Sequence, residues 1–228
     1  MRGKLIVVEG TDCSGKETQT NNLLKYLEKY GSVKKYSFPN YNSPTGKIVG
    51  GPYLGKKNIS LCWFNEGASN VPAKVASLYF AADRLYNITE IEKSLANGEN
   101  VILDRYTYSN MAHQGGKLET EEERDELFNW ISKLEFDFLG LPIPDIKIFL
   151  HLSNEGAKKL RAKRNEFEEL DEHEKNEQHL INAERTYIEL AKKFDFFTIE
   201  CMENDRIKTI EEISEEIYKY IDNEIIEK

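Results

Sequence analysis

The sequence is poor in cysteine and has no long apolar run. Its 228 residues include three cysteines, Cys13, Cys62 and Cys201, which are odd in number, widely spaced and not arranged as Cys-x-x-Cys. This pattern argues against a disulfide framework and against a zinc site, so we expect three reduced thiols. No apolar stretch approaches the ~20 residues that a membrane span needs, and the first residues lack the pattern of a secretion signal. We therefore expect a cytoplasmic protein without a membrane partner.

Positive charge is also scarce. Lys and Arg number 31 against 40 Asp and Glu, which gives a formal net charge of -9. A protein that binds nucleic acid usually has a basic face, so we expect no nucleic-acid partner. The acidic residues gather in residues 119–125 and 166–177, as in solvated helices or loops. An anionic ligand must therefore be held by basic side chains that are concentrated locally.

Short aliphatic runs alternate with segments of helical periodicity. The expected strands are residues 5–9, 33–38, 101–104, 146–152 and 196–200. The expected helices are residues 17–30, residues 72–95, and a closing helix with Ile207, Ile210, Ile213, Ile217 and Ile221 on one face. Residues 39–57 are rich in Pro, Gly, Asn and Ser and should form a loop or a broken helix. The alternation predicts an α/β fold with a parallel sheet and helices on both faces. No linker is evident, so we expect residues 1–228 to form a single domain.

A glycine-rich loop follows the first strand and opens the first helix. Its residues are Gly10, Thr11, Asp12, Cys13, Ser14, Gly15 and Lys16, followed by Glu17 and Thr18. This context is typical of a P-loop, whose backbone N–H groups surround phosphate oxygens at a helix N-terminus while the lysine contacts the β- and γ-phosphates. The usual motif has a hydroxyl directly after the lysine to bind Mg²⁺, but here that position is Glu17. No Asn-Lys-x-Asp segment for reading guanine is present, which argues against a switch GTPase.

Four further segments follow in a characteristic order. They are Phe38-Pro39-Asn40-Tyr41, Leu78 to Arg84, Asp104-Arg105-Tyr106 with Ser109 and Asn110, and a basic stretch around residues 158–164. Together with Gly10-x-Asp12 in the loop, this set resembles the thymidylate kinase family over nearly the whole chain. The resemblance implies a five-stranded parallel sheet of the P-loop type, ATP and Mg²⁺ as requirements, and a homodimer. It also implies transfer of the γ-phosphate of ATP to dTMP, with residues 10–18 binding ATP.

The segment that ends at Arg84 has a chemistry suited to a pyrimidine. Phe80 and Arg84 are four residues apart on a helix and so share one face, where the ring can stack on the base and the guanidinium can donate to O4. Without the resemblance, Phe80 in the core and Arg84 on the surface would be the simpler interpretation. Leu78 and Leu85 are expected to lie in the core.

Asp104 and Arg105 lie at the carboxyl edge of the expected sheet, where α/β proteins bind ligands. A carboxylate beside an ATP site can hold Mg²⁺ directly or through water, and Arg105 can grip the acceptor phosphate. A plain ion pair between the two is the alternative. The resemblance adds further acceptor contacts, namely Asp12, Phe38, Pro39, Ser109, Asn110, His113 and Gln114. Among these, His113 matches a position where the family often has an aromatic residue near the sugar 2′ carbon.

The resemblance also implies a lid, here about residues 156–176. In this family a basic residue that neutralises the γ-phosphate comes from the P-loop or from the lid, and the P-loop position is the neutral Cys13. Lys158, Arg161 and Arg164 are spaced three residues apart, so a helical turn places them on one side. We therefore expect catalysis to depend on Lys16, Arg105, Arg161 and Arg164.

Two alternatives stay open at this point. The chain could be another deoxynucleoside-monophosphate kinase, or one with relaxed base choice. It could also be a P-loop protein that binds a nucleotide and regulates a partner without turnover, an interpretation that Glu17 favours.

Overall fold

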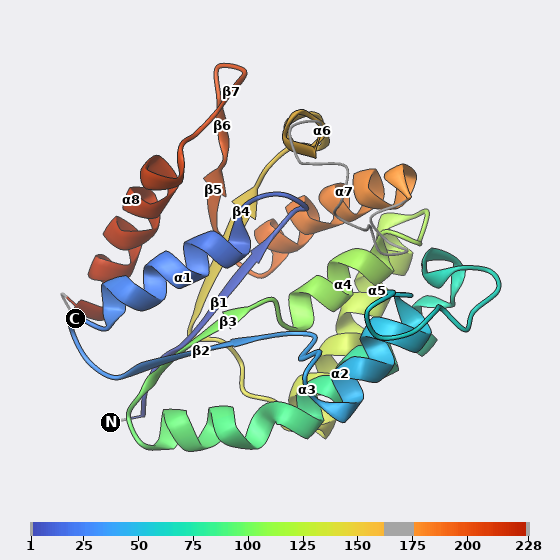
Figure 1. Ribbon diagram of the computed structural model, residues 1–228, viewed down its shortest axis with the longest axis horizontal. Helices are drawn as coiled ribbons and strands as arrows, with labels where there is room; N and C mark the ends of the chain where they lie inside the picture. The colour runs from blue at the N-terminus through green and yellow to red at the C-terminus, as the bar shows by residue number, and fades with distance from the viewer. Residues whose placement is uncertain (1, 162–175, 227–228) are drawn as a thin grey trace.

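Five strands form one parallel sheet in the computed structural model, which describes residues 2–161 and 176–226 (Figure 1). They are β1 (Leu5–Gly10), β2 (Val33–Ser37), β3 (Asn100–Asp104), β4 (Ile146–His151) and β5 (Phe197–Glu200). Their order across the sheet is β2-β3-β1-β4-β5. Each strand lies within one residue of its predicted bounds, so the predicted five-stranded parallel sheet is confirmed.

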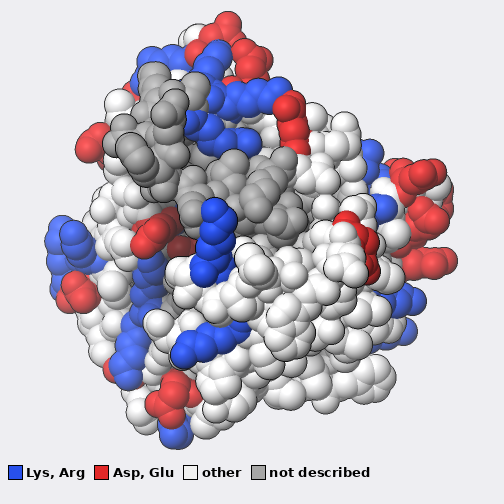
Figure 2. All heavy atoms as spheres, turned by 45° about the vertical axis from the view of Figure 1, so that its right-hand side comes forward, with Lys and Arg blue, Asp and Glu red and all other residues white. Residues whose placement is uncertain are grey.

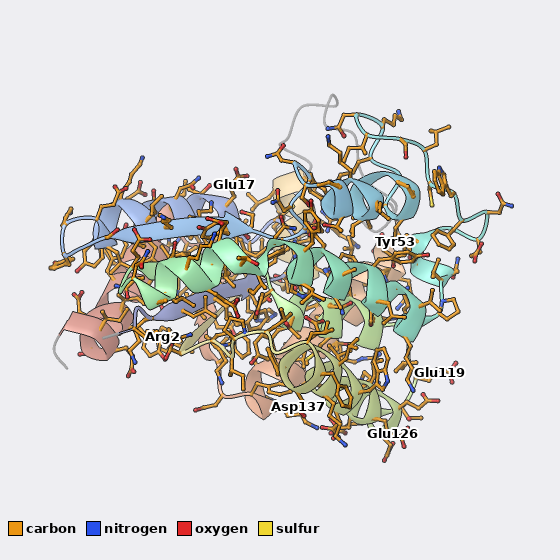
Figure 3. The ribbon with its side chains drawn as sticks, turned by 90° about the horizontal axis from the view of Figure 1, so that it is seen from below. Arg2, Glu17, Tyr53, Glu119, Glu126 and Asp137 are labelled. Carbon is orange, nitrogen blue, oxygen red and sulfur yellow. The ribbon has the colours of Figure 1, made fainter. Side chains whose placement is uncertain are left out.

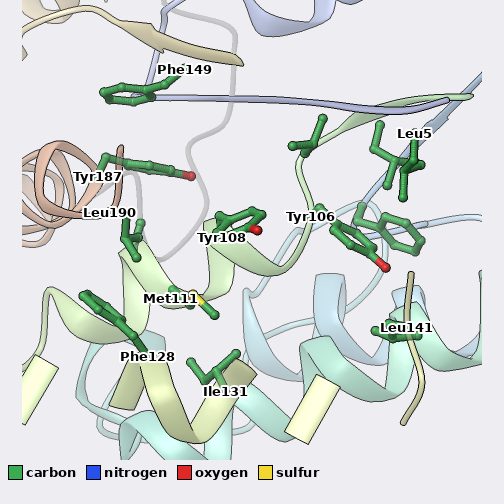
Figure 4. Close-up of a cluster of buried hydrophobic side chains, with 14 of the residues drawn as sticks. Leu5, Tyr106, Tyr108, Met111, Phe128, Ile131, Leu141, Phe149, Tyr187 and Leu190 are labelled. Atoms are coloured by element: carbon green, nitrogen blue, oxygen red, sulfur yellow. The ribbon is translucent and has the colours of Figure 1, made fainter. Parts of the chain in front are cut away.

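Helices cover both faces of the sheet (Figure 1). One face carries α1 (Lys16–Leu27) and α8 (Ile210–Ile221), and the other carries α3 (Ala73–Ala96), α4 (Thr107–Gly115), α5 (Glu121–Ser132) and α7 (Glu177–Lys193). Alternate residues of β1 supply the two cores: Leu5 and Val7 pack toward the larger helical layer, Ile6 and Val8 toward α1 and α8. Figure 4 shows the larger core, in which Tyr187 of α7 lies beneath Phe149 of β4, their rings stacked at 5.4 Å.

The remaining elements are short. They are α2 (Pro44–Ile48), a π-helical turn (Val49–Tyr53), a 3-10 turn (Ala68–Asn70), a second π-helical turn (Lys133–Phe138), α6 (Asn154–Arg161), a hairpin of β6 (Met202–Glu203) and β7 (Arg206–Ile207), and a last π-helical turn (Asp222–Ile226). The broken helix expected in residues 39–57 is therefore present. No helix in residues 2–161 or 176–226 is long and apolar enough to cross a bilayer.

The closing helix is shorter than predicted. Ile207 pairs with Met202 in the hairpin, because the helix begins only after Thr209, whose capping box with Glu212 fixes its start. Ile210, in the first turn, is half exposed. The buried stripe is therefore limited to the later isoleucines of α8.

The prediction that Leu78 and Leu85 lie in the core is wrong. They are 50% and 42% exposed, on a face of α3 that they share with the exposed Val75 and Tyr86. The buried side of α3 is instead formed by small and polar residues near its middle, including Arg84. Periodicity locates an apolar stripe on a helix but does not show which side of the helix faces the sheet.

The sheet brings the predicted motifs to one edge. Val8 of β1 is paired with Asp104 of β3, and Gly10 is paired with Leu150 of β4, so the loops after β1 and β3 leave the sheet side by side. The P-loop follows β1, and Arg105 joins β3 to α4 in a left-handed conformation with φ 67°. This edge is where parallel α/β sheets bind ligands.

Candidate active site

The loop between β1 and α1 is fixed by contacts with β4. The Thr11 hydroxyl donates to the carbonyl oxygen of Leu152 at 2.7 Å and accepts from its backbone N–H at 2.9 Å. A side chain on Gly10 would place its Cβ 2.8 Å from the carbonyl oxygen of Leu150, so only glycine fits there. Gly15, with φ 78°, is the left-handed residue that starts α1. The backbone thus has the form that a phosphate-binding loop requires.

Lys16 is turned toward its own loop. Its ammonium donates to the carbonyl oxygens of Thr11 at 2.8 Å and Gly10 at 3.0 Å, and it lies 3.5 Å from the Ser14 hydroxyl. Burial, and then the charge of Arg105, lower the pKa of Lys16 to about 8. An arriving phosphate would raise that pKa again, because an anion favours the ammonium form.

A cavity of about 190 Å³ lies beside the loop and collects most of the predicted acceptor residues. Those that line it are Asp12, Phe38, Pro39, Phe80, Arg84, Arg105, Ser109, Asn110 and His113. Gln114 does not line it; its side chain is completely buried, and neither amide atom has a hydrogen-bond partner within the described residues. Leu54, Lys56 and Leu180 also line the cavity and were not predicted.

Arg84, which lines the cavity, belongs to a buried ion pair. Arg84, which is 2% exposed, donates from Nε and Nη2 to the two carboxylate oxygens of Glu135 at 2.5 and 2.6 Å. Glu135 is completely buried and also accepts from the Thr107 hydroxyl at 2.8 Å and from the Asn110 amide at 3.3 Å. The ring of Phe80 stands edge-on to Tyr53, with centroids 5.6 Å apart. The alternative interpretation, in which Arg84 lies on the surface, is thus excluded.

A second buried carboxylate holds Ser109, another residue that lines the cavity. Glu9, at the end of β1, accepts from the backbone N–H groups of Tyr106 (2.8 Å) and Ser109 (3.0 Å), from the Ser109 hydroxyl (2.5 Å) and from the Tyr187 hydroxyl (3.3 Å). Burial raises the pKa of Glu9, and the hydrogen bonds from Ser109 and Tyr106 and the charge of Arg105 oppose that effect. Arg105 donates to the same two hydroxyls, at 3.2 and 3.3 Å.

Arg105 is a permanent cation in this surrounding. Burial lowers its pKa, but the neighbouring Tyr187 hydroxyl and the carboxylates of Asp104, Glu9 and Asp12 outweigh burial and raise the pKa above the ordinary value. Figure 2 turns the right-hand side of Figure 1 toward the viewer and shows several basic side chains near the middle of this view. The chain as a whole is acidic. Local positive charge therefore coexists with a negative total.

His113 packs against a second histidine rather than standing alone. Its Nδ1 lies 3.2 Å from Nε2 of His179, and the two rings are stacked. Burial, and then the charge of Lys117, lower the pKa of His179 to about 4. Lys117 donates to the carbonyl oxygens of Val71 at 2.7 Å and Ala68 at 3.0 Å, which ties α4 to the segment that precedes α3.

The lid-side arginine that the structure describes lies close to the P-loop. Arg161, the last residue of α6, has its Nε 3.6 Å from the Asp12 carboxylate. Lys158 pairs with Glu177 at the start of α7, an exposed pair of the kind that contributes little to stability. Arg164 and most of the predicted lid lie outside the described residues.

The base of α6 is held by a charged network. Glu184 of α7 accepts from the backbone N–H of Asn154 at 3.0 Å and from Nε2 of His151 at 2.9 Å. His151 also bonds Glu200 through Nδ1 at 2.7 Å. The hydrogen bond with Glu184, together with the second carboxylate, raises the pKa of His151.

The predicted metal residue, Asp104, differs in exposure from the two residues that follow Lys16. The Asp104 carboxylate at the end of β3 is 9% exposed and lies 4.0 Å from the Lys35 ammonium. Glu17 and Thr18 are exposed in the first turn of α1, where Figure 3 shows Glu17 at the molecular surface. In the described residues no group of three His, Cys, Asp or Glu side chains is arranged so that it could hold a metal ion. Mg²⁺ needs only one or two carboxylates when phosphates and water complete its shell, so Asp104 suits it.

Sequence reasoning missed Glu9, Glu135 and Tyr187. Glu9 gave a signal, since it is a charged residue that ends an otherwise aliphatic strand, and a buried charge requires partners. For Glu135 and Tyr187 the sequence contains no such signal, because their partners are distant in the sequence.

The sequence of this chain is similar to those of known proteins. A family model described as thymidylate kinase matches residues 8–217. The chain belongs to the thymidylate kinase family. It is 30% identical over 230 residues to a probable thymidylate kinase of Pyrococcus horikoshii, covering 99% of each chain. It is 29% identical to the thymidylate kinase of Dictyostelium discoideum, over 98% of this chain and 86% of that one.

The fold agrees with a solved structure of the family. The thymidylate kinase of Candida albicans superposes with a TM-score of 0.71 at 27% identity, covering 97% of this chain and 92% of that one. All of the predicted site residues of this chain, from Gly10 to Arg164, lie within the range that the thymidylate kinase model matches.

Proposed function

We propose that this chain transfers the γ-phosphate of ATP to dTMP, giving dTDP and ADP. The observation that carries the proposal is the junction at the sheet edge, where Asp12 of the P-loop lines the same cavity as Arg105, Arg84 and Asn110. A nucleoside monophosphate presents a phosphate, which Arg105 can bind, and a base, to which Arg84 and Asn110 can form hydrogen bonds. Family membership supports the same reaction, because the relatives that match are named thymidylate kinases.

The donor side is assigned to residues 10–18. Backbone N–H groups of the loop and the N-terminus of α1 would bind the ATP phosphates, and Lys16 would leave its carbonyl partners for the β- and γ-phosphates. Arg105 grips the acceptor phosphate while Ser109 and Tyr187 hold its guanidinium in place. An ionised phosphate is already a nucleophile, so positioning and charge neutralisation are sufficient.

Asp104 would hold Mg²⁺, directly or through water, and the ion would neutralise charge on the phosphates. Arg161 would add a further positive charge from the lid side, leaving Asp12 when the nucleotides arrive. The acceptor roles of Phe38, Pro39, His113 and Gln114, like the cytoplasmic location, stay predictions.

We also propose that the chain acts as a homodimer through α3. Val75, Leu78, Leu85 and Tyr86 form an exposed apolar face that extends over three turns of this helix. A second copy of the same helix, packed across this face, would remove it from water. Sedimentation velocity of the wild type and of Leu78→Glu tests this: a wild type that sediments as a monomer at micromolar concentration contradicts it.

The reaction is tested by release of ADP in a coupled assay, with and without an acceptor. We expect turnover with dTMP, weaker turnover with dCMP, dGMP and UMP, and a smaller gap to dUMP, since one methyl group in an apolar pocket is worth only about 1–3 kcal/mol. Nucleotide binding without ADP release under any acceptor would favour a regulator instead. A preference for dGMP would refute the assignment of the base.

A further inference from the structure

The carboxylate of Glu135 joins the two side chains that face the base. It accepts from Nε and Nη2 of Arg84 and from Nδ2 of Asn110. Arg84 and Asn110 line the cavity, whereas Glu135 lies behind them and does not. Any effect of Glu135 on a ligand must therefore act through these two residues.

The ion pair determines which edge of the guanidinium faces the cavity. Glu135 takes the edge that carries Nε and Nη2, at 2.5 and 2.6 Å. The remaining nitrogen, Nη1, has only a long contact of 3.5 Å with the carbonyl oxygen of Tyr106. Guanidinium has no acceptor, so the edge left for a ligand can only donate.

The same carboxylate determines how the Asn110 amide is turned. Nδ2 faces two acceptors, Glu135 Oε1 at 3.3 Å and the carbonyl oxygen of Ser77 at 3.4 Å. Turning the amide over would set Oδ1 against both of these oxygens. Oδ1 is instead buried and has no partner in the described part of the chain. A buried acceptor of this kind is costly unless a ligand supplies the donor.

We propose that Glu135 sets the hydrogen-bonding polarity of the base site, so that Arg84 offers a donor and Asn110 an acceptor. This inference rests on the proposed function and refines it. Thymine and uracil present O4, an acceptor, beside N3–H, a donor, and match the pattern at both points. Cytosine presents an amino donor beside an unprotonated N3 and is opposed at both points. Glu135 is thus a positioning residue that selects 4-oxo over 4-amino pyrimidines.

Replacing Glu135 by glutamine tests this role. The side chain of Glu135→Gln has nearly the same shape, but one of its two terminal atoms donates. Both carboxylate oxygens of Glu135 accept from Arg84, so the amide nitrogen removes one of these two contacts in either orientation. In the place of Oε1 it also opposes the Asn110 amide, which then turns its oxygen inward and its nitrogen toward the base. We expect the ratio of kcat/KM for dTMP over dCMP to fall at least about tenfold, since discrimination of this kind depends on correctly placed polar groups.

A matched control is available in α5 and α7. Arg124 donates to both carboxylate oxygens of Glu189 at 2.7 Å, and neither residue lines the acceptor cavity. Glu189→Gln changes the same kind of pair and should leave the dTMP to dCMP ratio within about twofold of wild type. A purely structural role for Glu135 would lower turnover of both acceptors equally and leave their ratio unchanged.

The two proposals fail differently. A wild type that releases no ADP with dTMP refutes the proposed function. A wild type that prefers dTMP while Glu135→Gln keeps its ratio refutes the role of Glu135 alone. If Glu135→Gln does not fold, the ratio is measured for Glu135→Asp, whose shorter carboxylate cannot reach Arg84 and Asn110 together. An unchanged ratio in that variant overturns the inference.

Discussion

Removing the Arg84 side chain should destabilise the fold as well as weaken dTMP binding. Arg84→Met keeps most of the side-chain volume but leaves the Glu135 carboxylate, which is completely buried, without its cation. Breaking a buried pair in this way costs about 3–5 kcal/mol. A chain of this size loses roughly 2–4 °C in Tm per kcal/mol, so we expect a fall of roughly 6–20 °C at neutral pH.

The double variant Arg84→Met with Glu135→Gln separates folding from recognition. The amide removes the uncompensated charge yet can still accept from Thr107 or Asn110, so most of the lost Tm should return. Ligand binding does not return with it. At a dTMP concentration of about 100 times Kd, the wild type should gain about 2.7 kcal/mol, or roughly 5–11 °C in Tm, while both variants gain much less.

Thermal denaturation followed by circular dichroism, with and without dTMP, measures both the Tm of each variant and the gain in Tm when dTMP binds. Arg124→Met is the control, because Glu189 keeps 28% of its side chain exposed and can be hydrated when its partner is removed. Its fall in Tm should be clearly smaller than that of Arg84→Met. A Tm for Arg84→Met within about 2 °C of wild type, or a double variant no more stable than the single one, would refute this account of the buried pair.

Three further predictions concern the rest of the site. Arg161→Ala should lower kcat on the order of a thousandfold while the dTMP Kd from calorimetry stays nearly unchanged; a kcat within about threefold of wild type contradicts this. Asp104→Asn should raise the Mg²⁺ concentration needed for half-maximal rate more than Glu17→Gln does, since Glu17 is exposed, and equal shifts in a metal titration count against Asp104. The raised pKa of His151 means that its stabilising contribution is fully present below about pH 6.5 and is lost as pH rises through the folded-state pKa. In urea denaturation His151→Asn should therefore destabilise more at about pH 6 than at about pH 9, and equal losses at both pH values would exclude a role for the imidazolium.

The elements that the sequence predicted well are those determined by local patterns. The strand before the P-loop, the glycines of the loop and the strand that ends in Asp104 each depend on neighbours within a few residues. Their geometry follows from backbone rules, as with the left-handed Gly15. The cavity residues were predicted because the motif order resembles a family, which supplies contacts that local patterns do not.

The residues that were missed depend on long-range contacts. Glu135 lies 51 residues after Arg84, and Tyr187 lies 178 residues after Glu9. No periodicity or spacing connects such positions. Leu78 and Leu85 were misplaced for a related reason: a leucine stripe is equally compatible with a core and with an exposed helix face until the packing partners are known.

The two buried carboxylates connect the proposed phosphate contact and the proposed base contact through one helix. Glu9 accepts from the backbone and side chain of Ser109 in the first turn of α4, and Glu135 accepts from Asn110, the next residue. Each carboxylate is anchored outside α4, one at the end of β1 and the other in the turn after α5. The start of α4 is thereby held from both sides, because Ser109, which contacts Arg105, is next to Asn110, for which we propose a contact with the base. A shift of α4 would move both residues together, so in the proposed site the same helix relates the phosphate contact to the base contact.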